Sequence, residues 1–183
     1  MAKCVFAGTF DPITIGHADI INQCATKYQK VLVVIGRNPL KDCLLTEPER
    51  LALTKKAFEN NKKIEVVLYS DYLDKYPQFL QENGEVVLFS DYHDNYPQFL
   101  KDNGYTVYVR GVRNQVDYDF ERQMEQKNLS KYPFITTEYV WSSEEMAGVS
   151  SSLVKRLIVD GKDYKKYIPK ECHELLQQLL NNK

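Results

Sequence analysis

The chain has 183 residues, a net charge of −1 and 27% charged side chains, a balance that argues against nucleic-acid partners and anionic membranes. No apolar run approaches the ~20 residues that span a membrane, and no apolar signal core follows the N-terminus. The four cysteines, Cys4, Cys24, Cys43 and Cys172, have no paired spacing, which argues against a zinc site or disulfide framework and is typical of a cytoplasmic protein.

The first predicted element is a short strand from Lys3 to Gly8, followed by the turn Thr9-Phe10-Asp11-Pro12. Thr14-Ile15-Gly16-His17 then opens a segment with helical spacing. A strand, a turn and a helix N-terminus bring unpaired N–H groups and the positive end of a helix dipole together, which suits a bound phosphate. Thr9 and His17 carry polar atoms that would contact it. Neither the Walker Gly-Lys-Ser/Thr nor the Gly-x-Gly-x-x-Gly spacing is present.

Alternating strands and helices follow. Residues 31–36 form an apolar run that predicts a second buried strand, and 37–42 are a loop with turn formers and positive charge. Thr46 and Glu49 form a capping box that opens a helix running to about Asn60. Residues 64–69 predict a third strand. This alternation is typical of a parallel sheet with right-handed crossovers.

An internal repeat occupies the middle of the chain. Residues 66–85 and 86–105 are two consecutive 20-residue copies that differ at only six positions. Two copies are fewer than a solenoid needs, so the pattern indicates a tandem duplication of one strand-plus-helix unit. An extra strand in mid-sheet would move the later strands outward by about 4.8 Å and separate the residues at their ends. We therefore expect the extra unit to be accommodated elsewhere.

The remaining elements complete a single α/β domain. The predicted order is a strand over 105–109, a helix over about 117–130, a strand over 135–141, a polar loop over 142–148, a helix from about 149 and an amphipathic tail over 170–180. In the tail, Leu175, Leu176, Leu179 and Leu180 form one stripe that indicates core packing or a subunit contact.

The ends of the predicted strands carry the polar residues of interest. In a doubly wound sheet, ligands bind outside the carboxyl ends of the strands. Those ends supply residues 9–17, 37–41, 70–71, 110–113 and the loop before Ser150. This set of hydroxyls, cations and a helix N-terminus suits several phosphates. The other histidines, His93 and His173, lie in the repeat and the tail, so no nucleophile-and-base triad is indicated.

Three segments carry a family resemblance. Gly8 to Pro12 with Thr14 to His17 resembles the signature of the nucleotidyltransferase superfamily with a His-x-Gly-His-type motif. Residues 110–121 and 149–154 are similar to further segments of its bacterial phosphopantetheine adenylyltransferase family. The resemblance implies one domain over residues 1–183. It also implies a Rossmann-like, doubly wound, parallel five-stranded sheet whose third strand lies at the edge, with the extra unit there as an added strand or a looped-out segment.

The resemblance also implies an activity. Such enzymes transfer AMP from ATP to 4′-phosphopantetheine with Mg²⁺, giving dephospho-CoA and pyrophosphate in coenzyme A biosynthesis. The Mg²⁺ would bridge triphosphate oxygens without a dedicated carboxylate cage. Members form hexamers, which implies that this chain is a homo-oligomer. The implied partners are ATP and 4′-phosphopantetheine, with no nucleic acid and no membrane.

Individual roles follow from the same resemblance. The implied catalytic residues are Thr9 and His17 at the α-phosphate, and Lys41 and Arg110 at the acceptor phosphate. The implied nucleotide contacts are Thr9, Phe10, His17, Gly111, Val112, Arg113, Glu121, Met146, Ala147, Gly148, Val149, Ser150, Ser151 and Ser152. The implied acceptor contacts are Thr9, Lys41, Leu73, Arg110 and Asn128. Leu73 of the first copy suits the apolar pantetheine arm better than His93 of the second.

Each residue also has a plainer interpretation when taken singly. Lys41 resembles an ordinary loop lysine, the two arginines are able to pair with Asp117 or Glu121, and the serines are able to cap a helix. Two alternative functions remain open. One is another nucleotidyltransferase, acting on nicotinate mononucleotide or glycerol phosphate, and the other is a non-catalytic nucleotide-binding regulator.

Overall fold

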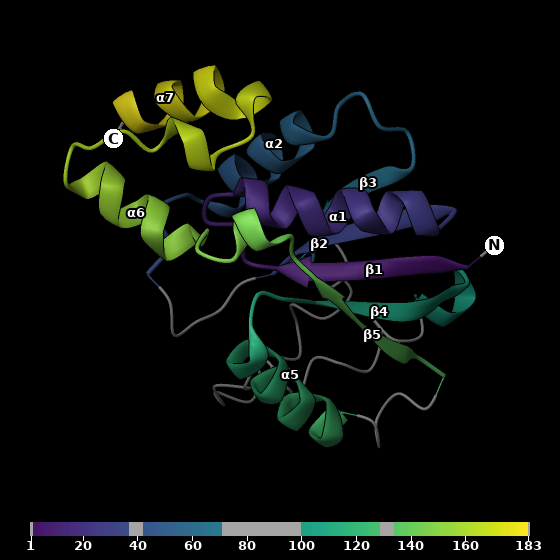
Figure 1. Cartoon of the computed structure of the whole chain (residues 1–183). Coiled ribbons are helices and arrows are strands. Elements are labelled where there is room, and N and C mark those ends of the chain that lie inside the picture. Colours follow the sequence, from purple (N-terminus) through teal and green to yellow (C-terminus); the bar gives the residue numbers. More distant parts are fainter. Residues whose placement is uncertain (1, 37–41, 71–99, 129–133, 183) are drawn as a thin grey trace, which may run out of the picture.

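The computed structural model describes residues 2–36, 42–70, 100–128 and 134–182, and is built on a five-stranded parallel sheet (Figure 1). The order of the strands across the sheet is β3-β2-β1-β4-β5. Their bounds are β1 (Lys3–Gly8), β2 (Lys30–Ile35), β3 (Ile64–Leu68), β4 (Tyr105–Val112) and β5 (Thr136–Trp141). Every pairing is parallel, which confirms the predicted Rossmann-like, doubly wound sheet.

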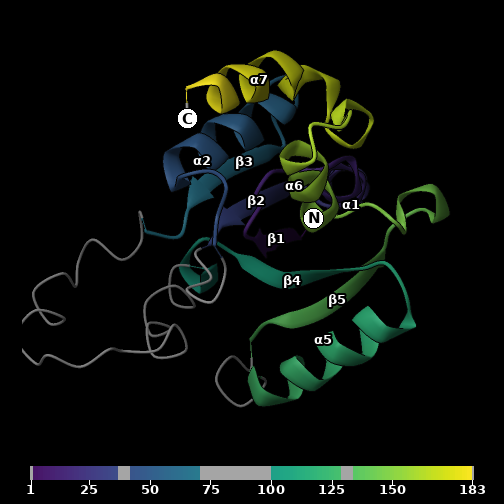
Figure 2. The same ribbon diagram turned by 90° about the vertical axis from the view of Figure 1, so that its left-hand side faces the viewer.

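Helices cover both faces of this sheet (Figure 2). One face carries α1 (Ile15–Lys27), α2 (Glu47–Ala57), α6 (Ser151–Val159) and α7 (His173–Asn181), and the other carries α5 (Gln115–Asn128). Because side chains alternate along a strand, the sheet separates two cores. The α1 side holds the larger one, which includes Phe6, Val33 and Val109, and the α5 side holds Val5, Leu32, Val34, Tyr69, Leu100 and Tyr105.

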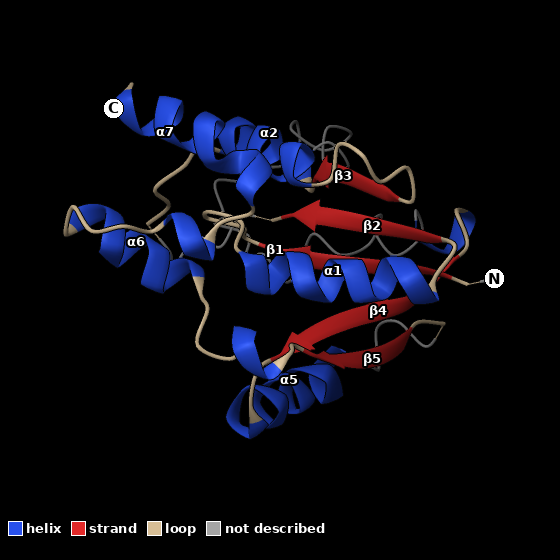
Figure 3. Cartoon of the chain, turned by 45° about the horizontal axis from the view of Figure 1, so that its top comes forward, coloured by secondary structure: helices blue, strands red, loops and turns tan. Residues whose placement is uncertain are grey.

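Local signals in the sequence set the helix ends. Thr46 and Glu49 form the predicted capping box at the start of α2, which ends at Ala57, slightly before the predicted end. The tail stripe packs inward, since Leu176 is fully buried and Leu175, Leu179 and Leu180 pack against the larger core. Figure 3 shows α7 beside α2. Short 3₁₀ turns are η2 (Glu144–Met146), η3 (Lys165–Tyr167) and η4 (Lys170–Cys172). Within the described ranges, no helix has the length and apolar character needed to cross a membrane.

The path of the chain creates a switch point between β1 and β4. After β1 the chain runs outward to β2 and β3, and it then returns to place β4 on the other side of β1. Ligands bind at the carboxyl ends of the strands beside such a reversal. β4 continues to Val112, beyond the predicted end at Val109, because residues 110–112 pair with residues 139–141 of β5. Arg110 and Gly111 therefore belong to a strand, not to the loop after it.

The repeat contributes to the sheet from both of its copies. Residues 66–68 of the first copy lie in β3, which is the edge strand, as expected. Leu100 to Gly104 of the second copy lead into β4, with Leu100 buried and Gly104 at a φ of 72° that favours glycine. β4 pairs directly with β1, so no strand of the described ranges separates them. Leu73 and His93 lie outside the described residues.

Candidate active site

The turn between β1 and α1 holds an unusual backbone conformation. Phe10 has a φ of 50°, in the left-handed region that non-glycine residues rarely adopt. Phe10 is 2% exposed, and its ring packs edge-on against the ring of His17, with the centroids 5.1 Å apart. The Asp11–Pro12 bond that follows is cis. This tight turn brings Thr9 and His17 to the same end of the sheet.

His17 is oriented by the N-terminus of its own helix. Thr14 is the N-cap of α1, and its hydroxyl accepts a hydrogen bond from the backbone N–H of His17. In return, the backbone N–H of Thr14 donates to Nδ1 of His17 at 3.1 Å. A backbone N–H can only donate, so Nδ1 acts as the acceptor and the neutral ring carries its proton on Nε2. His17 is thus prepared to donate a hydrogen bond from Nε2.

A second helix N-terminus adjoins the first. Ser150 is the N-cap of α6, and its hydroxyl accepts from the N–H of Leu153 at 3.1 Å. The hydroxyl of Ser151 donates to the carbonyl oxygen of Pro12 at 2.8 Å, which ties α6 to the turn. A Cβ at Gly16 would lie 3.6 Å from the carbonyl oxygen of Val149. The positive ends of two helices therefore lie side by side, which favours an anionic ligand.

The end of β4 presents different residues to the two faces of the sheet. Gly111 faces α1, where an added Cβ would lie 2.5 Å from Cδ1 of Ile20, so glycine permits the close approach of α1. Arg110 faces the α5 side. Its guanidinium lies 4.6 Å from the centre of the Tyr108 ring and 3.4 Å from the carboxylate of Glu121. Burial raises the pKa of Tyr108, although the charge of Arg110 opposes this shift.

The remaining predicted residues are spread around this end of the sheet. Arg113 forms a 2.7 Å ion pair with Asp117, so both arginines make the ion pairs of their plainer interpretation. Met146 lies in η2, and the loop continues through exposed Ala147 and Gly148 to buried Val149. Ser152 lies in the first turn of α6, and Val112 ends β4. Lys41 and Leu73 lie outside the described residues, as does the side chain of Asn128, which ends α5.

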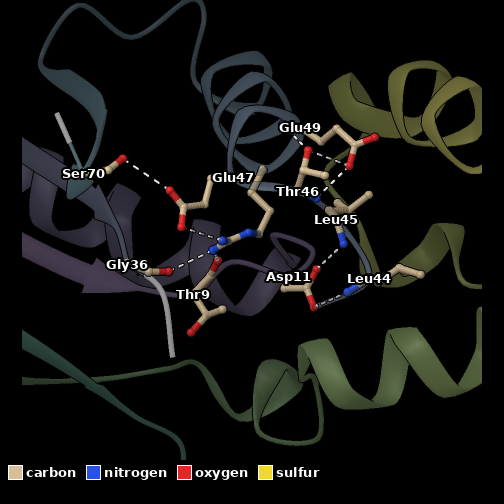
Figure 4. A network of polar contacts seen from close by, with 10 residues as sticks. Thr9, Asp11, Gly36, Leu44, Leu45, Thr46, Glu47, Glu49 and Ser70 are labelled. Carbon is tan, nitrogen blue, oxygen red and sulfur yellow. Dashed lines mark hydrogen bonds and ion pairs between the residues drawn. The ribbon is translucent and has the colours of Figure 1, made fainter. Parts of the chain in front are cut away.

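A buried polar network lies beneath the turn (Figure 4), and its two charged centres, Asp11 and Arg50, are not among the predicted site residues. Asp11 is 3% exposed, and its carboxylate accepts from the N–H groups of Leu44 and Leu45 at 2.9 and 2.8 Å and from Nζ of Lys155 at 3.1 Å. Arg50 of α2 is 2% exposed and donates to the carbonyl oxygen of Thr9. For Asp11, the sequence signal was its place inside the Gly8 to Pro12 motif. For Arg50, the sequence held no signal of burial, because a solvent-exposed arginine on a helix would have the same neighbours in the sequence.

Comparisons with known proteins match nearly the whole chain. The model of the cytidylyltransferase-like family matches residues 5–157. A phosphopantetheine adenylyltransferase of Lactobacillus johnsonii is 32% identical, covering 100% of this chain and 97% of the relative. The enzyme of that name from Thermotoga neapolitana is also 32% identical, with 96% and 95% covered. A solved structure described as a "putative nicotinate-nucleotide adenylyltransferase" of Vibrio parahaemolyticus has a TM-score of 0.67 at 16% identity, covering 97% of this chain and 93% of its own, and so shares the fold.

Proposed function

Because this chain belongs to the phosphopantetheine adenylyltransferase family, within the cytidylyltransferase-like proteins, we propose that it transfers the adenylyl group of ATP to 4′-phosphopantetheine. The products are dephospho-CoA and pyrophosphate. The observation that carries this proposal is full-length similarity to named enzymes, joined to two helix N-termini at the switch point of the sheet. The solved nicotinate-nucleotide adenylyltransferase structure shares the fold at only 16% identity, whereas the phosphopantetheine adenylyltransferase relatives are 32% identical over nearly their full length, which favours 4′-phosphopantetheine as the acceptor.

The proposed step is a direct displacement at phosphorus. An oxygen of the acceptor phosphate forms a bond to the α-phosphorus of ATP, and the bond from that phosphorus to the bridging oxygen breaks as pyrophosphate leaves. The attacking oxygen is already ionised, so no general base is needed. Catalysis then consists of alignment and of stabilising charge on the equatorial oxygens. Nε2–H of His17 is the donor suited to this task, because Thr14 occupies Nδ1. Thr9 lies in the same turn and is proposed to contact the same phosphate.

The nucleotide is proposed to lie across the ends of β1, β4 and α6. The first N–H groups of α6, at Ser151 and Ser152, precede the first intrahelical hydrogen bond and suit phosphate oxygens. Ser150 is engaged as the N-cap, so its backbone rather than its hydroxyl would serve the ligand. Further proposed nucleotide contacts are Phe10, Gly111, Val112, Arg113, Glu121 and the segment Met146, Ala147, Gly148 and Val149.

The acceptor is proposed to approach from the α5 side of the sheet. Arg110 faces that side and keeps 28% of its side chain exposed, enough to meet a phosphate. Lys41 is proposed as a second cation there, and Leu73 and Asn128 as contacts of the pantetheine arm. Two cations would hold the phosphate of either acceptor. The apolar contact on the arm is what would distinguish 4′-phosphopantetheine from nicotinate mononucleotide.

Magnesium is proposed to travel with the triphosphate. In the described part of the chain, no three His, Cys, Asp or Glu side chains gather into a metal cage. Mg²⁺ in phosphate-transfer sites is held largely by substrate phosphates and water, so we propose that the triphosphate supplies its ligands. When bound, Mg²⁺ would neutralise charge on the phosphate oxygens. The residues of the chain would then hold ATP and orient it.

A coupled assay for pyrophosphate tests the proposed activity. The purified chain is given ATP with 4′-phosphopantetheine, nicotinate mononucleotide or glycerol phosphate in parallel. We expect turnover with 4′-phosphopantetheine alone. Turnover with another acceptor would support the alternative transferase, whereas tight ATP binding without turnover would support a regulator.

The exposed apolar residues Val116, Phe120 and Trp141 lie on α5 and β5 and support the further proposal of a homo-oligomer. Because members of the family form hexamers, we propose a hexamer. Light scattering of the same preparation tests this proposal.

The repeat offers a matched pair of deletions. We propose that residues 1–183 are one domain in which the units 66–85 and 86–105 arose by tandem duplication. Removing residues 71–90 or residues 74–93 leaves one unit in each case, and the two products differ only in having His93 or Leu73 at one position. The product that keeps Leu73 should have a KM for 4′-phosphopantetheine lower by about tenfold, the value of one buried leucine. Equal KM values in the two products would remove Leu73 from the acceptor site.

A further inference from the structure

Arg50 joins the ends of two strands to α2. Its Nη1 donates to the carbonyl oxygen of Thr9 at 2.6 Å and to that of Gly36 at 2.9 Å. Thr9 follows β1 and Gly36 follows β2, so one guanidinium nitrogen bridges neighbouring strand ends (Figure 4). The carboxylate of Glu47 lies 4.0 Å from Nη2 and accepts a hydrogen bond from Ser70 beyond β3. The first turns of α2 thereby hold three strand ends.

The carbonyl that Arg50 holds belongs to the strained turn. The peptide group between Thr9 and Phe10 includes the carbonyl oxygen of Thr9, so its rotation would change the φ of Phe10. A left-handed φ at phenylalanine is unfavourable and persists only where surrounding contacts enforce it. The ring of Phe10 packs on the imidazole of His17. A contact chain therefore runs from the guanidinium of Arg50 through this peptide and the Phe10 ring to His17.

We propose that Arg50 is a positioning residue for adenylyl transfer, which it serves by fixing the Thr9–Phe10 peptide and thereby the imidazole of His17. The inference rests on the proposed function. In-line displacement is sensitive to alignment, since a misplacement of about 1 Å lowers rates by about 10²-fold. A residue that merely docked α2 would affect stability without this effect on the chemical step. Arginine suits the position because a buried cation needs acceptors: Nη1 has two carbonyl oxygens and Nη2 lies 4.0 Å from the Glu47 carboxylate, while Nε has no hydrogen-bond partner in the described part of the chain.

Three variants separate positioning from stability. Arg50→Gln removes the charged donor, Arg50→Lys keeps a cation, and Leu53→Ala is the control on the same helix, where a fully buried apolar side chain is lost. At saturating substrates, Arg50→Gln should lower kcat by about 30-fold or more while both KM values change less than about threefold. Arg50→Lys should recover a large part of that loss. Leu53→Ala should lower the melting temperature and leave kcat within about twofold.

A second measurement is independent of turnover. In NMR spectra of the free protein, the Cε1–H signal of His17, assigned by comparison with His17→Ala, should shift in Arg50→Gln and stay in place in Leu53→Ala. An unmoved signal, a kcat no lower than that of Leu53→Ala, or a loss confined to KM would overturn the positioning role. If Arg50→Gln does not fold, Arg50→Lys carries both measurements, with smaller changes of the same direction. A wild-type protein without turnover would overturn the proposed function, while the His17 signal would still decide the role of Arg50.

Discussion

Replacing His17 by alanine should lower kcat by at least ~100-fold, the scale observed when a donor to a transition-state oxyanion is removed. The imidazole is held by Thr14 at Nδ1 and by the ring of Phe10, so Nε2–H is fixed before substrate binds. A fixed donor needs no reorganisation when charge develops at the α-phosphate, and alanine offers no replacement. Pyrophosphate release at saturating ATP and 4′-phosphopantetheine measures the effect.

His173→Ala is the matched control for this prediction. Nε2 of His173 lies 2.9 Å from the carbonyl oxygen of Lys165 and 3.0 Å from that of Ile168, in the α7 region. Its loss removes a histidine with backbone contacts while the strand ends are untouched, so kcat should stay near the wild-type value. A His17→Ala enzyme as fast as the control would remove His17 from the mechanism.

Replacing Asp11 by alanine should lower the free energy of unfolding by about 3 kcal/mol. The buried carboxylate accepts from two backbone N–H groups, at Leu44 and Leu45, and pairs with Lys155. Without it, the N–H groups of Leu44 and Leu45 lose this buried acceptor, and Nζ of Lys155 keeps only one of its two hydrogen bonds within the described residues, to the carbonyl oxygen of Asp42. The exposure of Lys155, at 28%, limits the loss because its ammonium can turn toward water. Urea denaturation followed by circular dichroism measures the change.

Asp19→Ala provides the comparison for Asp11. The carboxylate of Asp19 also accepts a backbone hydrogen bond, from Ser143 at 2.9 Å, but this contact is exposed to solvent. Water can satisfy the N–H of Ser143 after the substitution, so the loss should be about 1 kcal/mol or less. Similar losses in the two variants would show that burial of the Asp11 network contributes little to stability.

Much of the fold and part of the site could be predicted before any coordinates. The alternation of apolar runs and helical segments predicted the parallel sheet, and Thr46 with Glu49 predicted the start of α2. The Gly8 to His17 motif indicated the site at the end of β1. The roles of all the predicted site residues remain predictions, and Lys41 and Leu73 also lie outside the described residues.

Other features depended on contacts between distant parts of the chain. Arg50 contacts Thr9, 41 positions away, and Gly36, 14 positions away. Asp11 contacts Leu44, 33 positions away, and Lys155, 144 positions away. The extent of β4 depended on its pairing with β5, and this pairing placed Arg110 and Gly111 within the strand.

The physical reason for this division is the range of the interactions involved. Helix caps and apolar periodicity involve residues a few positions apart, so they are visible in a short stretch of sequence. Which buried charge meets which carbonyl depends on the order of the strands and on the face each helix covers. Those relations arise only when the whole sheet is assembled, and they place Arg50 under Thr9 and Arg110 on the α5 side.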